Sequence, residues 1–332
     1  GSIMATAANA VARTGVGKLT STSANSVTVT ARNGDIGSVG SPLLVDSPTV
    51  LLKTIDISGG IQTRDVFATL NNTSNLTLTA GNGFLVLSDT ALTDLNVTTQ
   101  GSGVSALSIT APGQVFGLLR NGAAVDMSGT TSGAALNALT VDVRAGSARI
   151  LLGGQAANAL SVSASNVLTL DGTAPLTLNN ATSQTFTGAS IVATGTVAAS
   201  TGTQSFSSTG NTSFTGTINL NATSSQNISA SGNLIFTGTG GLTSSGSQTI
   251  SVTGNQTYTA QGGAIAITGV NQVLQGFGGT SQMVFQGGTA AGESITVSGS
   301  ANQTLQTTDN ASSAIRLLGG SADGFPTGRL RH

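Results

Sequence analysis

Residues 204–250 read QSFSSTG NTSFTGTINL NATSSQNISA SGNLIFTGTG GLTSSGSQTI, and they contain a repeat of 22 residues. The repeat extends over about residues 182–262, and four kinds of position recur in it at this spacing. These positions are Gln204, Gln226 and Gln248; the apolar Phe206, Ile228 and Ile250; Gly188, Gly210, Gly232 and Gly254; and the aromatic Phe214, Phe236 and Tyr258. Four independent columns with one period identify a repeat architecture.

The repeat becomes looser toward the C-terminus. Asn271-Gln272-Val273-Leu274 follows the equivalent residues Ser247-Gln248-Thr249-Ile250 by 24 positions. Asn302-Gln303-Thr304-Leu305 then follows by 31 positions. Insertions of this kind are expected in loops that protrude from a repetitive core.

Within the repeats and before them, apolar and polar residues alternate with period two, which is typical of strands. Examples are Ser26-Val27-Thr28-Val29, Asn75-Leu76-Thr77-Leu78, Leu139-Thr140-Val141-Asp142-Val143, Leu160-Ser161-Val162 and Leu176-Thr177-Leu178. Strong helix formers are scarce, since the chain has a single glutamate, Glu293, and two lysines, Lys18 and Lys53. We therefore predict an all-β fold.

A 22-residue period with two or three short strands fits one coil of a parallel β-helix, or solenoid. Strands stacked about 4.8 Å apart bring equivalent residues into contact. Gln204, Gln226 and Gln248 are then expected to form an amide ladder, and the recurrent glycines to turn each coil with positive φ. The length corresponds to about fifteen coils. A β-sandwich array and an up-and-down barrel fit the local alternation but not the 22-residue columns.

The chain is expected to form a single β-helical shaft segment over residues 1–332. We expect irregular coils over 1–181, regular repeats over 182–262, and looser coils with a frayed tail over 263–332. Gly1-Ser2-Ile3-Met4 reads like a cloning scar, and no signal peptide follows it. The chain is therefore interpreted as a fragment of a longer protein.

Composition excludes several classes of function. The chain has no cysteine, so it has neither disulfides nor thiolate metal sites. Its net charge of −1 lacks the basic character that binding to nucleic-acid phosphates requires. No apolar run is long enough to span a bilayer as a helix. Charged residues make up only 7% of the chain, so neutral polar side chains must form most of the surface.

The segment Asn33-Gly34-Asp35-Ile36-Gly37-Ser38, followed by Ser41-Pro42-Leu43-Leu44-Val45, resembles a phrase of filamentous-haemagglutinin-like exoproteins of Gram-negative bacteria. Recurring N-x-L-T-L and T-G-x-x-x-F-T-G phrases are similar as well. The resemblance implies a large protein secreted by the two-partner route through an outer-membrane partner, with a right-handed β-helical shaft that acts in adhesion or biofilm formation. The family's secretion domain carries an N-P-N-G signature, and this chain has no Asn-Pro pair, so the resemblance implies shaft.

Charged residues are distributed unevenly. None lies between Asp171 and Glu293, a stretch of 121 residues, so we expect no acid–base catalysis there. The Ser, Thr, Asn and Gln side chains of this stretch suit contacts with sugar hydroxyls. Alternatively, they only solvate a stack in which repeated charges would repel one another.

One cluster in the first half suggests an enzyme. Its members are Asp126, Asp142, Arg144, Arg149 and Asp171. Carboxylates at coil spacing beside an arginine can hold Ca²⁺ and abstract a proton, as in polysaccharide lyases. The alternative is that Asp142 and Arg144 form an exposed ion pair worth less than about 1 kcal/mol. Because the single histidine, His332, lies in the tail, a nucleophilic triad lacks its usual base. We expect no catalytic, cofactor-binding or metal-binding residues.

Three weaker motifs were weighed. Residues 15–20, GVGKLT, resemble a phosphate loop, but Ala12 and Leu19 replace residues that the loop requires. Gly34-Asp35 and Asp323-Gly324 are not tandem nonapeptides, so calcium-roll repeats are not supported. Thr-x-Thr phrases would form an ice-binding face only if the threonines aligned in columns, and the strongest columns here are glutamine, glycine and aromatic.

The chain also contains many Asn-x-Ser/Thr sequons, which a composition rich in these residues produces by chance. They include Asn75, Asn96, Asn180, Asn211, Asn221, Asn227, Asn255 and Asn302. In the family that the chain resembles, some such sequons are glycosylated.

The sequence thus predicts a non-enzymatic segment of a secreted or surface-displayed bacterial exoprotein. It is expected to act as a stalk or adhesin that contacts glycans, matrix or other cells, without a cofactor and without nucleic acid. The alternatives are a structural filament subunit that self-associates through its coil ends and, less favoured, a carbohydrate-active β-helical enzyme. Open strand edges at coil ends would permit the first alternative.

Overall fold

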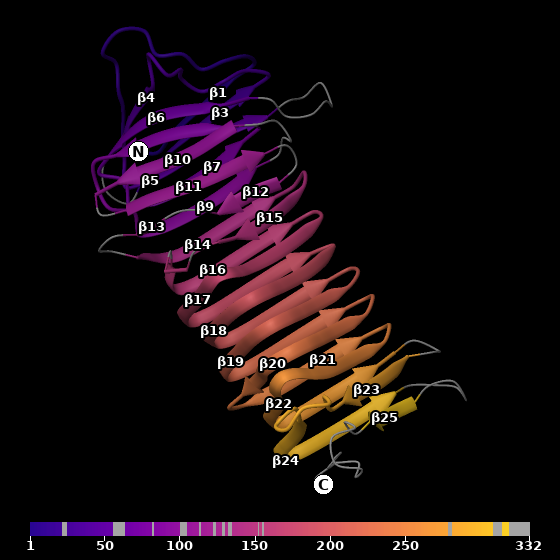
Figure 1. Ribbon diagram of the computed structural model, residues 1–332. Coiled ribbons are helices and arrows are strands. Elements are labelled where there is room, and N and C mark those ends of the chain that lie inside the picture. The colour runs from indigo at the N-terminus through magenta and orange to yellow at the C-terminus, as the bar shows by residue number, and fades with distance from the viewer. Residues whose placement is uncertain are drawn as a thin grey trace. The chain divides into compact units, whose positions relative to one another are not determined.

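The computed structural model describes residues 1–21, 25–55, 64–81, 83–99, 105–112, 114–121, 124–127, 130–131, 135–151, 153–154, 156–277, 281–307 and 314–318. In this part of the chain every regular element is a strand (Figure 1), and no helix that could cross a membrane is found. The chain divides into two compact units, unit 1 over Gly1–Asn166 and unit 2 over Val167–His332. The boundaries expected at residues 181 and 262 stay predictions.

Unit 1 contains mostly short strands. They are β1 Ile3–Ala7, β2 Leu19–Thr20, β3 Ser26–Arg32, β4 Leu43–Asp46, β5 Thr49–Ile55, β6 Val66–Asn71, β7 Asn75–Ala80, β8 Phe84–Ser88, β9 Asp94–Thr99, β10 Ser105–Ala111, β11 Gln114–Asn121, β12 Ala124–Met127, β13 Thr130–Thr131, β14 Leu136–Val143, β15 Ser147–Ile150 and β16 Ala156–Ala164. One stack of parallel strands runs β1–β3–β5–β7–β9–β14–β16, and a second runs β2–β4–β6–β8–β10.

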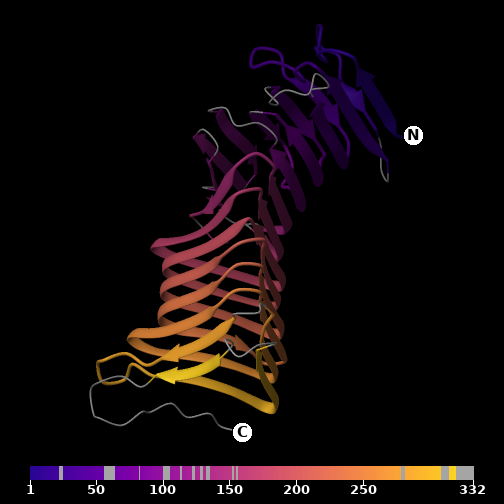
Figure 2. The ribbon, with the colours of Figure 1, turned by 90° about the vertical axis from the view of Figure 1, so that its right-hand side faces the viewer.

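Unit 2 contains longer strands that bend around the coil. They are β17 Val167–Gly188, β18 Ser190–Ser208, β19 Thr212–Ala230, β20 Leu234–Ser244, β21 Ser247–Val252, β22 Gln256–Gly276, β23 Gln282–Gln286, β24 Ile295–Thr307 and β25 Ala314–Leu318. All their described pairings are parallel, and Figure 2 shows the coils of this unit as successive layers. The predicted all-β parallel solenoid is confirmed, and the sandwich and barrel alternatives are excluded.

The expected number of coils was too high. The two units hold about 11 turns with coils of about 23 residues, in place of about fifteen. One reason is that β11 is antiparallel to β10, β12 and β13, so residues 105–131 form a hairpin insertion that adds no regular turns. The dipeptides Pro112-Gly113 and Asn121-Gly122, which are hairpin signals, lie between these strands in the sequence. A second reason is the longer coils near the C-terminus, where Asn271 pairs with Asn302.

The core of unit 2 consists of columns of inward-pointing residues from successive coils. The aromatic column expected from the repeat is confirmed, since Phe214 pairs with Phe236, and Phe236 with Tyr258. All three side chains are fully buried. The rings of Phe214 and Phe236 meet edge to face with centroids 6.0 Å apart, a favourable geometry for aromatic pairs. Tyr258 stacks on Phe285 of the next coil at 5.0 Å.

A second column is the predicted amide ladder, which is also confirmed. The Nε2 atom of Gln226 donates to Oε1 of Gln204 at 2.8 Å, and Nε2 of Gln248 donates to Oε1 of Gln226 at 2.7 Å. The ladder is longer than the three predicted residues. Gln184, Gln272 and Gln303 extend it through bonds of 2.7–2.8 Å. All six amides point the same way, each donating to the preceding coil.

The prediction that the recurrent glycines turn the coils with positive φ was wrong for the column that it named. Positive φ occurs instead in the column Gly195, Gly216 and Gly238, at 74°, 114° and 136°. Gly232 and Gly254 are needed for a different reason. A Cβ atom at either position would overlap the Oδ1 atom of an asparagine in the preceding coil, Asn211 or Asn233. Close backbone approach, and not φ, selects glycine there.

The Gly34-Asp35-Ile36-Gly37 segment of unit 1 has an equally structural explanation. A Cβ atom at Gly34 would overlap the backbone of Ala10, and Gly37 has a φ of 69° against the carbonyl of Phe67. Ile36 is fully buried and bridges Val11 and Val66 in adjacent coils. This segment therefore lets three coils of unit 1 stack closely.

Candidate functional site

The charged residues expected to form one enzymatic cluster form two separate ion pairs in unit 1. Arg149 on β15 binds both carboxylate oxygens of Asp126 on β12, at 3.0 Å each. Arg144 donates from Nε to Asp142 at 2.8 Å, which is the ion pair expected within one strand. Asp142 also accepts a hydrogen bond of 2.6 Å from Ser163. Each carboxylate is thus already bound by its own neighbours.

Asp171, the fifth member of that set, belongs to unit 2. Its Oδ1 atom accepts a hydrogen bond of 2.9 Å from the backbone N–H of Thr173, so it closes a local turn. Among the residues that the structure describes, no group of three or more His, Asp or Glu side chains is placed to hold a metal ion. His332 and Asp323-Gly324 lie outside the described residues.

The GVGKLT segment leads into β2 and not into a helix, which a phosphate loop would require. Lys18 instead forms an ion pair of 2.6 Å with Asp46. Hydrogen bonds from Lys18 and from the amide of Asn72 hold the pKa of Asp46 below its usual value. This lysine therefore joins two strands of unit 1.

Two aspartates of unit 1 form a pair that the sequence did not reveal. Asp35 accepts a hydrogen bond of 3.0 Å from the backbone N–H of Asp65, and Asp65 accepts one of 2.7 Å from Gly83. Partial burial, with a further contribution from Asp35, raises the pKa of Asp65 despite the bond from Gly83. Both carboxylates fix the entry of successive coils into a strand, which is a structural role.

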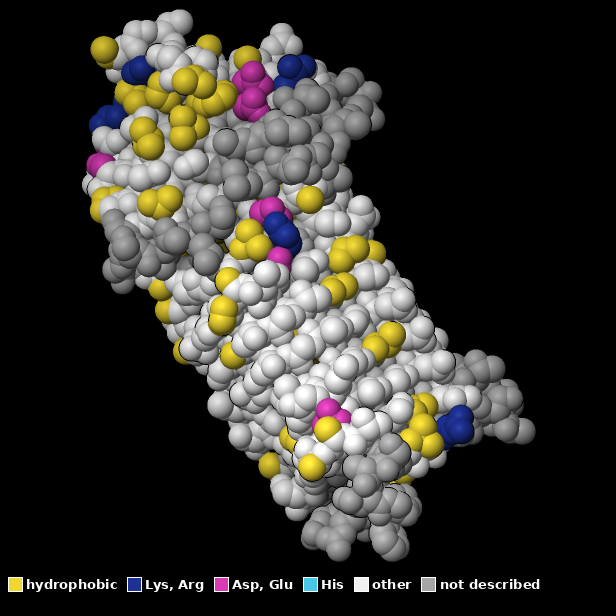
Figure 3. All heavy atoms as spheres, viewed as in Figure 1, with side chains coloured by type: hydrophobic (Ala, Val, Ile, Leu, Met, Phe, Trp, Pro, Cys, Tyr) yellow, Lys and Arg dark blue, Asp and Glu magenta, His cyan; other side chains and the backbone are white. Residues whose placement is uncertain are grey.

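The outer surface of unit 2 is built from columns of neutral polar side chains. Thr194, Thr215, Thr237 and Thr259 form one column, and Ser183, Thr203, Ser225, Ser247, Asn271 and Asn302 form another. Because residues 172–292 carry no charge, these columns present only hydroxyl and amide groups and short aliphatic carbons. Figure 3 shows this part of the surface as largely neither charged nor hydrophobic. It can hydrogen-bond neutral ligands but cannot transfer protons at neutral pH.

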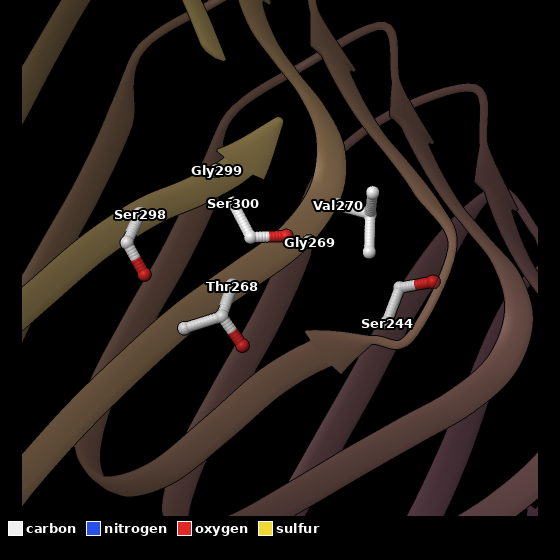
Figure 4. Close-up of a pocket in the computed structure, with 7 residues that line it drawn as sticks. All are labelled: Ser244, Thr268, Gly269, Val270, Ser298, Gly299 and Ser300. Atoms are coloured by element: carbon white, nitrogen blue, oxygen red, sulfur yellow. The ribbon is translucent and has the colours of Figure 1, made fainter. Parts of the chain in front are cut away.

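A cavity of about 420 Å³ interrupts this regular surface (Figure 4). It is lined by Ser244, Thr268, Gly269, Val270, Ser298, Gly299 and Ser300, from three successive coils. Its size lies within the range of roughly 300–1,000 Å³ that is typical of small-molecule sites. The four hydroxyl-bearing side chains and the single valine give it neutral hydrogen-bonding groups beside one apolar wall.

The cavity arises from a change in coil length. Gly269 pairs with Gly299, but the next paired residues are Asn271 and Asn302, so two residues of β24 lie opposite one residue of β22. The insertion inferred from the spacing of the Asn-Gln phrases marks this place in the sequence. Which side chains line the cavity could not be inferred, because the register of the bulge was unknown.

The sequon asparagines have different environments. Asn221 and Asn227 are exposed on the outer surface, whereas Asn180 is buried and accepts a hydrogen bond from Gln184. The side-chain oxygens of Asn211 and Asn255 each accept a backbone N–H of the next coil, at 2.8 and 3.0 Å. Asparagine is therefore structurally useful at several of these positions, whether or not any of them is modified.

Comparison with known proteins finds no matching family model, no matching curated protein and no matching solved structure.

Proposed function

We propose that this chain is a non-enzymatic stalk segment of a secreted or surface-displayed bacterial exoprotein of the filamentous-haemagglutinin-like kind, and that its outer surface contacts neutral glycans. The observation that carries the proposal is the uncharged surface of unit 2, where hydroxyl and amide side chains repeat in register from coil to coil. Each added coil extends a solenoid by about 4.8 Å without a new fold, which suits a protein that spaces a binding region away from a surface.

The candidate charges support a stalk over an enzyme. Asp126 and Asp142 are both held in ion pairs with arginines, at 3.0 and 2.8 Å. A general base would need a carboxylate free to approach substrate. The cavity at Thr268 and Val270 supports contact with a neutral ligand, because sugar hydroxyls pair with hydroxyl side chains and the apolar wall can cover a C–H face.

The proposal is tested by applying the labelled whole chain to an array of neutral glycans, polyanionic glycans and matrix proteins, at low and high salt. We expect saturable binding to a class of neutral glycan, competed by the free glycan and unchanged by salt, because screening acts only on charges. Binding confined to polyanions and lost at high salt would contradict the proposal. Silence over the whole array would remove the contact function and leave only a spacer.

A pair of variants then tests the cavity. Val270→Trp fills the cavity and should abolish glycan binding, since Val270 is its apolar wall. Val273→Trp is the matched control, because Val273 points outward from the same strand between Thr249 and Thr304. Equal loss in both variants would show that the glycan does not bind in the cavity.

A further inference from the structure

One outer face of unit 2 meets a condition that the sequence left open. Thr194, Thr215, Thr237 and Thr259 pair in register on four successive coils. All four point outward, with Thr215 exposed and the others partly exposed. The threonines of this face therefore do align in a column, in addition to the glutamine, glycine and aromatic columns seen in the sequence.

A second outward column lies two residues earlier on the same strands. The two columns together form what we call the threonine face: Val192, Ser213, Ile235 and Thr257, with Thr194, Thr215, Thr237 and Thr259. Neighbouring groups on this face are about 4.8 Å apart between coils and about 6.6–6.8 Å apart along a strand. It is thus a two-dimensional array of hydroxyl and branched methyl groups.

The threonine face is firmly supported from inside. The residue between its two columns is Ala193, Phe214, Phe236 or Tyr258, and each of these side chains is buried. Phe206, Phe214 and Phe236 pack edge to face behind the face, with centroids 5.7 and 6.0 Å apart. Parallel main-chain pairing links every coil to the next. The array therefore has one defined geometry.

The chemistry of the threonine face restricts its partner. A charged side chain holds its own hydration shell, but the coils that form this face lie within the charge-free residues 172–292. A neutral lattice is the electrostatic complement of such a surface. The aromatic side chains of these coils, Phe214, Phe236 and Tyr258, all point inward, so the face offers no ring on which a sugar could stack. Methyl groups beside hydroxyls order the first water layer, and the hydroxyls bond to it.

We propose that the threonine face binds ice, through a water layer that takes up the repeat of the protein and continues into the crystal. This inference is independent of the proposed glycan contact, since the cavity is lined by residues of other strand segments. The partner is crystalline water, whose oxygens form a neutral, regularly spaced array of hydrogen-bond donors and acceptors.

The test measures the rate of ice recrystallisation and the shape of growing ice crystals in solutions of the whole chain. Wild type should slow recrystallisation and facet the crystals. Thr215→Tyr places a ring in the centre of the array, and it should abolish both effects. Thr249→Tyr is the matched control on the outer side of β21, and it should retain them. Circular dichroism melting of each variant shows that the fold is kept.

Three results would overturn the inference. Wild type could act on ice no more than an unrelated protein at equal mass, or Thr249→Tyr could lose activity to the same degree as Thr215→Tyr. Alternatively, Thr215→Tyr could abolish binding to an insoluble crystalline polysaccharide, or dissociate a dimer seen by sedimentation, while ice growth is unaffected throughout. The face would then be a glycan surface or a contact between copies.

Discussion

Gln226 donates one side-chain proton to Oε1 of Gln204, at 2.8 Å, and the other to the main-chain carbonyl of Leu220, at 2.9 Å. Its own oxygen accepts from Gln248 at 2.7 Å. Gln204 and Gln226 are 2% and 1% exposed. A buried amide must find partners for both protons and for its oxygen, and a stack of identical coils supplies them at the correct spacing. The ladder therefore fixes the register of the coils as well as filling their interior.

Replacing Gln226 by leucine should lower the free energy of unfolding of unit 2 by about 2–6 kcal/mol. The change leaves the oxygen of Gln204 and the carbonyl of Leu220 without their donor, and each unsatisfied buried group costs roughly 1–3 kcal/mol. Urea unfolding followed by circular dichroism measures the effect. Asn227→Leu is the control, because Asn227 is exposed on the adjacent outer column, and it should change stability by less than about 0.5 kcal/mol. Equal shifts in both variants would contradict a stabilising ladder.

Gly216→Ala should destabilise unit 2 by about 1–3 kcal/mol or more, since a non-glycine residue at unfavourable φ is strained by that amount. Gly216 has a φ of 114°, and a Cβ atom there would overlap the carbonyl oxygen of Gly195. The midpoint of thermal unfolding gives the measurement. Gly17→Ala has open space and ordinary φ, so an unchanged midpoint is expected for it. An unchanged midpoint for Gly216→Ala would show that the coil does not turn in this way.

The two ion pairs of unit 1 should matter little to stability. Asp126→Asn and Asp142→Asn should each cost less than about 1 kcal/mol, because the arginine side chains are largely exposed and such pairs are weak. Thermal unfolding of the whole chain gives the comparison. A larger loss in both variants, or the loss of any activity on polysaccharides, would instead favour the enzymatic alternative.

The loop around Glu293 should loosen in acid. Backbone N–H groups of Ala290 and then Gly262 bind its carboxylate, at 2.8 and 2.7 Å, and hold its pKa below the usual 4.5. Because the folded pKa is lower than the unfolded one, the contribution to stability is complete well above pH 4.5 and is lost as the pH falls through the folded pKa.

Hydrogen exchange of the Gly262 and Ala290 amides, compared at neutral and acidic pH after correction for intrinsic rates, measures this loosening. Protection should fall in acid in the wild type and be low at both pH values in Glu293→Gln. Protection that is independent of pH, and equal in the variant, would show that the carboxylate does not hold the loop.

The columns of unit 2 could be predicted because a solenoid converts a sequence period directly into contact. Gln204, Gln226 and Gln248 recur every 22 residues, and they touch for that reason. The threonine column was missed because Thr194 and Thr215 are 21 residues apart whereas Thr215 and Thr237 are 22 apart. A single-residue change of coil length hides such a column until the register is known.

Other features depended on geometry that no period carries. The cavity at Gly269 arises from a bulge, and the bond from Asp65 to Asp35 joins coils of unequal length. The five charges proposed as a cluster were grouped by sequence distance. The pairing of Asp126 with Arg149 was set by strand register, which the irregular first half of the sequence does not reveal.

Both proposals for the surface of unit 2 require that glutamine amides lock its coils in register. Hydrogen exchange of the glutamine side-chain amides, resolved by NMR, tests this most directly. The ladder predicts that the Nε2 protons of Gln204, Gln226 and Gln248 exchange far more slowly than those of the outward Gln275, because they are buried and hydrogen-bonded. Exchange of all four at one fast rate would contradict the ladder, and with it the fixed surface array.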